Sequence, residues 1–341
     1  MDMGFFLKKL EAECGPALKA AGFAKGCESG GGAAGFEYRF DEPMSGHTAF
    51  RVGGPADLWI RPGEKAFPVV AGLVLRLARE EGIPLFILGG GANLVVSDRG
   101  IRGIVLDTGA WTGLLEEGDP SSLWIRAGTP VDQAAELAAG RSLSGLEFLA
   151  GMPGSVGGAV WMNARCYDRS VSDVLGETEF LVFPASNQGR DSGPARGEIK
   201  RVPVKREEFG YKKSPFQAIE ALILAACFTL APGSPEKIRE KMEALRRDRK
   251  ERGQYRFPSA GSAFKNHRTL GAPTGRIVDE MGLLGFAIGG ARVAPWHGNF
   301  IINQGNATAG DIRALVEELI RRIRAERGFA PEPEILFVGE W

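Results

Sequence analysis

The sequence has no net charge and no long apolar run. Its 42 Lys and Arg residues balance 42 Asp and Glu residues, so we expect no general attraction to nucleic acid or to an anionic membrane. The longest uninterrupted apolar segment, 221–231, is much shorter than the roughly 18 to 20 residues that a membrane-spanning helix needs. It predicts one buried strand, and neither nucleic acid nor a membrane is expected as a partner.

Residues that bind metals are also scarce. The four cysteines and three histidines are Cys14, Cys27, Cys166, Cys227, His47, His267 and His297. None of their spacings is typical of a metal site, so no metal ion is expected, and the cysteines are expected to be reduced thiols. The first residues lack a positively charged segment followed by an apolar core and a cleavage site. We therefore expect a cytoplasmic protein.

Length and hydrophobic pattern predict about two domains after an N-terminal appendage. The 341 residues are enough for two cores. Helical spacing over 5–22 and a small, flexible segment at 26–35 make 1–41 a helix followed by a linker. A mixed pattern of strands and helices covers 42–231, and a boundary rich in Pro, Gly and charge precedes a smaller domain, 232–341. The expected helices are 67–81, 131–141, a charged helix after Ser234, 274–282 and 309–327, and the expected strands are 84–88, 103–106, 123–127, 221–231 and 334–339.

Three consecutive glycines, Gly89–Gly91, separate two strand-like segments, 84–88 and 94–96. Adjacent glycines are costly to order, so they indicate the close approach of a ligand or of another main chain. A dinucleotide fingerprint would have to open a helix, whereas the apolar residues of the second segment favour a strand. The loop is therefore either a nest of N–H groups for phosphate oxygens or a tight turn without a ligand.

A second glycine-rich stretch covers 145–164, with the sequence GLEFLAGMPGSVGGAVWMNA. Its segment 154–158 enters the helical pattern AVWMNA, and unpaired N–H groups at a positive helix end suit an anion. Two such loops in one domain fit a long ligand with a diphosphate, held from two sides. Tight turns between buried strands remain the alternative.

Seven motifs follow one another in the order of one flavoprotein family. They are EPMSGHTAFRVGGPADLWI, FILGGGANLVVSD, GLEFLAGMPGSVGGAVWMNA, FGYKKSPF, PSAGSAFKN, GGARVAPWHGNFIINQGNATAGDI and PEPEILFVGEW. From about Glu42 to Trp341 the chain resembles the UDP-N-acetylenolpyruvoylglucosamine reductases of peptidoglycan precursor synthesis, in their shorter type without a long insertion after the fourth motif. The resemblance implies an α+β fold: an FAD-binding domain of the vanillyl-alcohol-oxidase/PCMH type, then a smaller α/β substrate-binding domain.

The resemblance also implies non-covalent FAD, with NADPH as co-substrate and a small UDP-sugar as substrate. The implied cofactor-binding residues are Arg51, Val52, Gly53, Gly54, Leu88, Gly89, Gly90, Gly91, Ala92, Asn93, Leu94, Met152, Pro153, Gly154, Ser155, Gly157, Gly158, Ala159 and Val160. Ala92 stands where the family usually has Ser, which removes a hydroxyl contact and leaves the main-chain donors. The loop 89–94 has no His or Cys, so no covalent flavin link is expected there.

The implied reaction is the NADPH-dependent reduction of UDP-N-acetylglucosamine enolpyruvate to UDP-N-acetylmuramate. Hydride addition to the terminal enol carbon places negative charge on the adjacent carbon and its carboxylate, so the site has to stabilise an enolate and then protonate carbon. Ser262 matches the family's proton donor and Glu334 its assisting carboxyl group.

Further positions match the family less directly. Tyr211, Lys265 and Asn266 match substrate-contacting positions. For His297, which lies in HGNF where HANF is commoner, we favour a structural role.

Two departures from the family's motifs concern the positively charged catalytic residue. Lys212 stands where the family has a catalytic Arg, and it lacks the planar fork that grips a carboxylate. We assign it a catalytic role as a point charge. Arg165, in NARCYD where NAGAYG is usual, could supply the guanidinium instead. A solvent-exposed loop Arg is the commoner case.

Two other functions remain open from the sequence. The first is a flavin oxidase of the same fold that uses O₂, against which GSAFKN and the terminal Glu argue. The second is a flavin-binding module whose catalysis has decayed, against which the retention of Ser262 and Glu334 argues.

Overall fold

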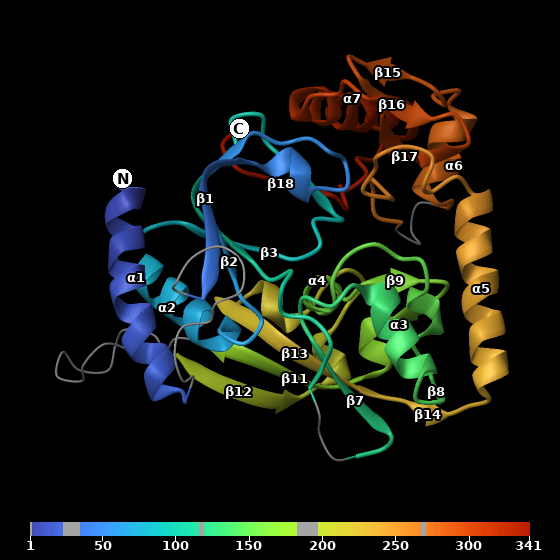
Figure 1. Cartoon of the computed structure of the whole chain (residues 1–341). Coiled ribbons are helices and arrows are strands. Elements are labelled where there is room, and N and C mark those ends of the chain that lie inside the picture. Colours follow the sequence, from blue (N-terminus) through green and yellow to red (C-terminus); the bar gives the residue numbers. More distant parts are fainter. Residues whose placement is uncertain (1, 23–34, 116–118, 183–196, 267–270) are drawn as a thin grey trace. The chain divides into compact units, whose positions relative to one another are not determined.

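A computed structural model describes residues 2–22, 35–115, 119–182, 197–266 and 271–341 (Figure 1). The predicted linker 26–35 falls outside these ranges except for its last residue, as do Cys27 and His267. The chain forms two compact units. The first unit contains 1–40, 58–90 and 103–246, and the second contains 41–57, 91–102 and 247–341.

Two sheets organise the first unit. One has the order β1-β2-β5-β3 and the other the order β12-β11-β13-β7-β6. Their strands are β1 (Phe36–Pro43), β2 (Pro55–Pro62), β3 (Leu85–Leu88), β5 (Ile101–Asp107), β6 (Leu114–Leu115), β7 (Ser122–Arg126), β11 (Leu175–Val182), β12 (Glu198–Pro203) and β13 (Ala221–Thr229). The short pairs are β8 (Leu143–Ser144) with β14 (Ala231–Pro232) and β9 (Arg165–Cys166) with β10 (Arg169–Ser170).

Strand β13 is the apolar run that the sequence marks as buried. It pairs antiparallel with β11 on one side and β7 on the other. Residues 222–228 are all buried, because both faces of this strand are covered. The predicted strand at 221–231 is confirmed for 221–229, after which the chain continues into β14.

The helices of the first unit cover its sheets through apolar faces. They are α1 (Met3–Ala20), α2 (Phe67–Glu80), α3 (Val131–Ala139) and α4 (Val156–Trp161), and α5 (Pro235–Glu251) begins in this unit. Helices α1 and α2 lie side by side (Figure 1), and Phe6, Leu10, Val70 and Val74 belong to one apolar cluster. The appendage predicted at the N-terminus therefore packs through its helix onto the first unit.

The second unit is built around a small antiparallel sheet. Its order is β15 (Ala287–Ile288), β16 (Ala291–Ala294), β17 (His297–Asn303), and it packs with α6 (Thr274–Glu280) and α7 (Ala309–Arg327). A parallel pair joins β4 (Leu94–Val96) to β18 (Leu336–Val338). Helix α7 begins at a capping box of Thr308 and Asp311 and ends at Gly328, whose φ is 78°. These two signals account for limits that match the prediction.

Five short 3₁₀ turns complete the described elements. They are η1 (Met44–His47), η2 (Glu147–Leu149), η3 (Val171–Asp173), η4 (Arg206–Glu208) and η5 (Pro215–Gln217). Among the described residues, no helix combines the length and the apolar character needed to cross a membrane.

The predicted elements are largely confirmed, with one shift. The helix expected over AVWMNA, 159–164, instead spans Val156–Trp161, because Asn163 adopts a left-handed conformation with φ 42° and ends it. The α+β class is confirmed by the mixture of helices with sheets that are mainly antiparallel, although β3 pairs parallel with β5. The division by function at 41 and 231 stays a prediction.

Candidate active site

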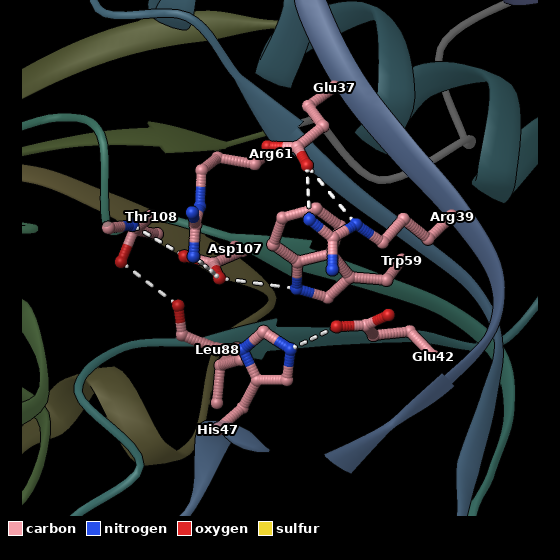
Figure 2. A network of polar contacts seen from close by, with 10 residues as sticks. Glu37, Arg39, Glu42, His47, Trp59, Arg61, Leu88, Asp107 and Thr108 are labelled. Atoms are coloured by element: carbon pink, nitrogen blue, oxygen red, sulfur yellow. Dashed lines mark hydrogen bonds and ion pairs between the residues drawn. The ribbon is translucent and has the colours of Figure 1, made fainter. Parts of the chain in front are cut away.

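The start of the first glycine loop is fixed by the end of β5. Leu88 is the last residue of β3, and its carbonyl oxygen accepts hydrogen bonds from the N–H and the hydroxyl of Thr108, both at 3.0 Å. Asp107, with only 3% of its surface exposed, accepts from Trp59 Nε1 at 3.2 Å and from Arg61 at 2.8 Å (Figure 2). This network holds the strand from which the loop begins.

The two glycine-rich stretches are in direct contact within the first unit. A Cβ at Gly89 would lie 2.5 Å from Ser155 Oγ, and one at Gly90 would lie 2.7 Å from Gly154 Cα. Ser155 is the N-cap of α4, and its Oγ accepts from the N–H groups of Gly90 at 3.2 Å and Gly158 at 3.4 Å. Main-chain packing therefore already requires glycine here, whether or not a ligand is bound. The two loops therefore adjoin, and the expectation that they hold a diphosphate from two sides stays a prediction.

The second unit contains the rest of the predicted flavin loop. A Cβ at Gly91 would lie 1.9 Å from the carbonyl oxygen of His47, and one at Gly54 would lie 2.1 Å from that of Asp98. Arg51 has a left-handed φ of 56°. This unit thus holds Arg51, Val52, Gly53, Gly54, Gly91, Ala92, Asn93 and Leu94, and the first unit holds Leu88, Gly89, Gly90, Met152, Pro153, Gly154, Ser155, Gly157, Gly158, Ala159 and Val160.

The main chain at 91–93 fits a phosphate-containing cofactor. Within the described residues, the N–H groups of Gly91, Ala92 and Asn93 meet no hydrogen-bond acceptor. Consecutive N–H donors beside a left-handed residue, here Gly91 with φ 59°, form an anion-binding nest. Since these donors are main-chain groups, the change from Ser to Ala at 92 leaves them in place. The residues present therefore fit the diphosphate of FAD.

Main-chain contacts join the segment that contains Ser262 to the segment that contains Glu334. Ala263, which follows Ser262, accepts a hydrogen bond through its carbonyl oxygen from the N–H of Glu334 at 2.7 Å. Phe264 forms a β-bridge to Pro333. Glu334 is 9% exposed, and its carbonyl oxygen accepts from Asn93 Nδ2 at 2.9 Å. Two predicted catalytic residues and one predicted flavin residue therefore share one local framework.

Strand β17 supports this framework from the other side. Asn299 is 2% exposed; its Oδ1 accepts from the N–H of Phe264 at 2.9 Å and its Nδ2 donates to the Phe264 carbonyl at 2.8 Å. The Asn299 N–H donates to His297 Nδ1 at 3.2 Å. Burial lowers the pKa of His297, so the neutral ring accepts this bond. These contacts support a structural role for His297.

Two predicted substrate-binding residues have partners within the second unit. Lys265 Nζ forms an ion pair with Glu332, and its side chain is 13% exposed. Asn266 Oδ1 accepts from the N–H of Thr274 at 2.9 Å, at the first residue of α6. Contact of either residue with a substrate stays a prediction.

Tyr211 and Lys212 occupy the centre of a tight turn in the first unit. Gly210 and Lys213 exchange two main-chain hydrogen bonds, at 3.0 and 3.1 Å. Lys212 has φ 58°, the left-handed conformation of the third residue of a type II turn. Its ammonium lies 6.0 Å from the centre of the Tyr211 ring.

Arg165 forms an ion pair with Asp168 at 3.2 Å, and the Asp168 side chain is fully exposed. Such an exposed pair is weak, so it does not prevent Arg165 from turning to an anion. The choice between Lys212 and Arg165 stays a prediction.

Sequence reasoning missed three supporting residues. Asp107, Asn163 and Asn299 are each buried polar residues. Asp107 is the last residue of β5, IRGIVLD, and Asn299 lies within β17, HGNFIIN. A polar residue at such a position in an apolar strand is the signal that could have identified them.

Comparison with known proteins gives one consistent family. Residues 72–182 match the family model of an FAD binding domain, and residues 253–338 match that of the UDP-N-acetylenolpyruvoylglucosamine reductase C-terminal domain. The reductase of that name from Treponema denticola is 37% identical over 314 residues, which cover 89% of this chain and 94% of the relative. The one from Treponema pallidum is 38% identical over 334 residues, with the same coverages.

A solved structure agrees with these relatives. The crystal structure of UDP-N-acetylenolpyruvylglucosamine reductase from Thermus caldophilus is 32% identical to this chain, with a TM-score of 0.65. The match covers 89% of this chain and 98% of the chain from Thermus caldophilus. The similarity therefore extends over both units.

Proposed function

The chain belongs to the UDP-N-acetylenolpyruvoylglucosamine reductase family, and we propose how its own residues perform the reduction of UDP-N-acetylglucosamine enolpyruvate to UDP-N-acetylmuramate. The reaction uses NADPH through bound FAD and serves peptidoglycan precursor synthesis. The substrate is a small UDP-sugar, and we place the reaction in the cytoplasm, where NADPH and nucleotide sugars are available.

One observation supports the assignment of the site more than any other. The carbonyl oxygen of Ala263 accepts from Glu334 N–H at 2.7 Å, while the Glu334 carbonyl accepts from Asn93 Nδ2 at 2.9 Å. A proton donor, a buried carboxyl group and a flavin loop are needed together by this chemistry, and here three separate parts of the sequence supply them. A binding module without catalysis would not require this combination.

The cofactor residues bind and orient. FAD, when bound, would supply the hydride that NADPH delivers. The N–H groups of 91–93 would hold its diphosphate. Ser155 joins the other glycine loop to Gly90 at 3.2 Å, so the loops are ordered before any ligand arrives. Preorganised donors of this kind lose little conformational freedom on binding.

The catalytic residues handle charge and a proton. Ser262 Oγ gives its proton to the carbon that bears the substrate carboxylate, which completes the reduction of the double bond. A hydroxyl is a weak acid, so this step depends on a fixed position beside a strongly basic carbanion. Glu334 assists the enolate, and Lys212 balances its negative charge. Lys265 and Asn266 hold the diphosphate and the sugar of the UDP-sugar substrate.

A Ser262→Ala variant tests this account. Because only the proton donor is removed, flavin reduction by NADPH should remain, and reduction of the enolpyruvyl substrate should fall by roughly 10² to 10⁴. Both half-reactions are measured by stopped-flow absorbance of the flavin.

Ser259→Ala serves as the matched control, because Ser259 lies in the same motif but donates to the Ile301 carbonyl at 2.7 Å. It should lose stability and keep most of the substrate half-reaction. Near-normal turnover of Ser262→Ala would contradict the assigned role. Loss of both half-reactions would show that the substitution disrupts the structure.

A further inference from the structure

Asn163 ends helix α4 in a conformation that few residues adopt. Its φ is 42°, its N–H donates to Val160 at 3.1 Å, and the next N–H, of Ala164, donates to Ala159 at 2.8 Å. This is a Schellman motif, in which Gly is the usual residue and Asn the second choice. Helix termination alone therefore does not explain why a side chain is present.

The side chain of Asn163 makes two hydrogen bonds in a buried environment. Only 3% of the residue's surface is exposed. Its Nδ2 donates to the Gly210 carbonyl at 2.8 Å, and its Oδ1 accepts from the Ser172 N–H at 3.0 Å. One amide group therefore connects the end of α4 to Gly210, the first residue of the turn that carries Tyr211 and Lys212.

The other end of that turn is attached to the same helix. Ser214 Oγ donates to the Trp161 carbonyl at 2.7 Å, and Gln217 Nε2 donates to it at 3.0 Å. Gln217 Nε2 also lies 3.1 Å from the Lys212 carbonyl. The turn is therefore attached to the C-terminal end of α4 on both sides of Lys212, with Asn163 alone among the described side chains bonded to Gly210.

We propose that Asn163 is a positioning residue that fixes the Lys212 turn relative to the glycine loop of α4. The inference rests on the proposed function, in which Lys212 balances the charge of the enolate. A flexible lysine side chain has to be placed by its main chain, and Lys212 holds a left-handed φ that non-glycine residues rarely adopt. The bond from Asn163 stabilises that turn, because it fixes the carbonyl that also accepts from Lys213.

An Asn163→Asp variant separates this role from general stability. Asp tolerates the left-handed conformation and keeps an oxygen for the Ser172 N–H, but its second oxygen faces the Gly210 carbonyl without a proton. Protonation would turn that oxygen into a donor and restore the bond. Burial favours the protonated form, so the defect should recover as pH falls.

The expected result is a pH-dependent loss in one half-reaction. Relative to the natural protein, Asn163→Asp should reduce the enolpyruvyl substrate on the order of 10-fold more slowly near pH 8.5 and recover toward pH 6. Flavin reduction by NADPH should be unchanged at both values. An Asn163→Asp variant whose substrate half-reaction is normal at both values would overturn the proposal.

A second variant and a second readout do not depend on the acidic side chain. Asn163→Gly suits the left-handed position and removes both side-chain bonds, so it should show the same loss without recovery at low pH. Hydrogen–deuterium exchange at the Lys213 amide should be faster in Asn163→Gly, by on the order of 10-fold. Unchanged exchange would contradict the inference whatever the activity of the protein.

Asn303→Gly is the matched control for exchange. Asn303 is also buried, donates to the Phe50 carbonyl at 2.9 Å and accepts from Ala307 N–H at 3.0 Å. It lies in the second unit, so its substitution should leave exchange at Lys213 unchanged. Faster exchange in this control too would show general loosening and overturn the specific role. If the unsubstituted protein fails to reduce the enolpyruvyl substrate, the proposed function fails, whereas the exchange result still decides the contact.

Discussion

Asn93 Nδ2 donates a hydrogen bond of 2.9 Å to the carbonyl oxygen of Glu334, although the two residues are 241 positions apart in the sequence. The bond lies next to the parallel pairing of β4 with β18, in which Leu94 faces Leu336. It connects the end of the predicted flavin loop to the predicted catalytic carboxyl group. A change at Asn93 should therefore affect more than cofactor binding.

We predict that Asn93→Ala lowers both stability and substrate reduction. It leaves a part-buried carbonyl without its partner, which costs about 1–3 kcal/mol of unfolding free energy, and it releases the main chain of Glu334. Urea unfolding and the rate of enolpyruvyl reduction at saturating FAD measure the two effects.

Ser97→Ala is the comparison for Asn93→Ala. Ser97 Oγ donates to the Glu340 carbonyl and so fastens the segment after β18, away from Glu334. It should lose a similar amount of stability and keep the substrate half-reaction. Equal loss of activity in both variants would show that Asn93 acts only through the stability of this segment.

The purified protein should be yellow and contain one FAD per chain. In the proposed site the N–H donors of 91–93 would hold the cofactor through hydrogen bonds, and the loop 89–94 has no His or Cys for a covalent link. Denaturation should therefore release the flavin into the supernatant, where its absorbance is measured. A colourless protein that takes up no added FAD would contradict the assigned site.

The cation of the site can be assigned by two alanine variants. Lys212→Ala should slow substrate reduction on the order of 10²-fold, as expected when a preorganised charge is removed, and flavin reduction should be spared. Arg165→Ala should be nearly silent, because the assignment of the charge to Lys212 leaves Arg165 without a role in the substrate half-reaction. The reverse pattern would assign the role to Arg165, and two silent variants would exclude both.

Lys212→Arg tests the geometry of the pocket. An arginine adds a planar fork that can bind a carboxylate at two points, and it also adds volume. A site shaped for the family's arginine should keep or gain activity in the substrate half-reaction. A loss would show that the pocket has adapted to the ammonium group.

Acid should destabilise the protein through His297. Burial, assisted by the nearby Arg252, lowers the pKa of this residue below 6.5, its ordinary value. The unfolded chain then binds a proton more readily than the folded chain, so the stabilising contribution is complete above about pH 6.5 and is lost as pH falls through the folded pKa.

His297→Gln removes this titration and keeps an acceptor for the Asn299 N–H. Urea unfolding of both proteins between about pH 8 and pH 5 should show a smaller decline for the variant. Equal declines would mean that other groups cause the acid sensitivity.

Local signals in the sequence predict the helices of the described residues and some of the strands. The expected limits of helix α7 agree with the structure, where Thr308 and Gly328 mark its ends, and β13 corresponds to the apolar run that predicts one buried strand. Such signals depend on neighbouring residues, so they can be read from one sequence. The end of α4 was misplaced because its stop is an Asn in a left-handed conformation rather than a Gly.

The site was predicted less completely, for a physical reason. The glycines at 89–91 correctly indicate a close approach, but the sequence alone does not distinguish a ligand from a neighbouring main chain. In the structure, the main chain of Gly154 lies against Gly90 and that of His47 lies against Gly91. The supporting bonds of Asn93, Asn163 and Asn299 join residues far apart in the sequence or depend on burial. Neither property can be read from local pattern.

This chain is expected to transfer reducing equivalents from NADPH to an enolpyruvyl double bond. The most direct test mixes purified protein with NADPH and UDP-N-acetylglucosamine enolpyruvate in the absence of O₂, and follows NADPH absorbance and the mass of the product. The proposed function predicts that NADPH and substrate are consumed in equal amounts, with a product heavier by two hydrogen atoms. Consumption of NADPH only when O₂ is admitted, or bound FAD without any consumption, would contradict it.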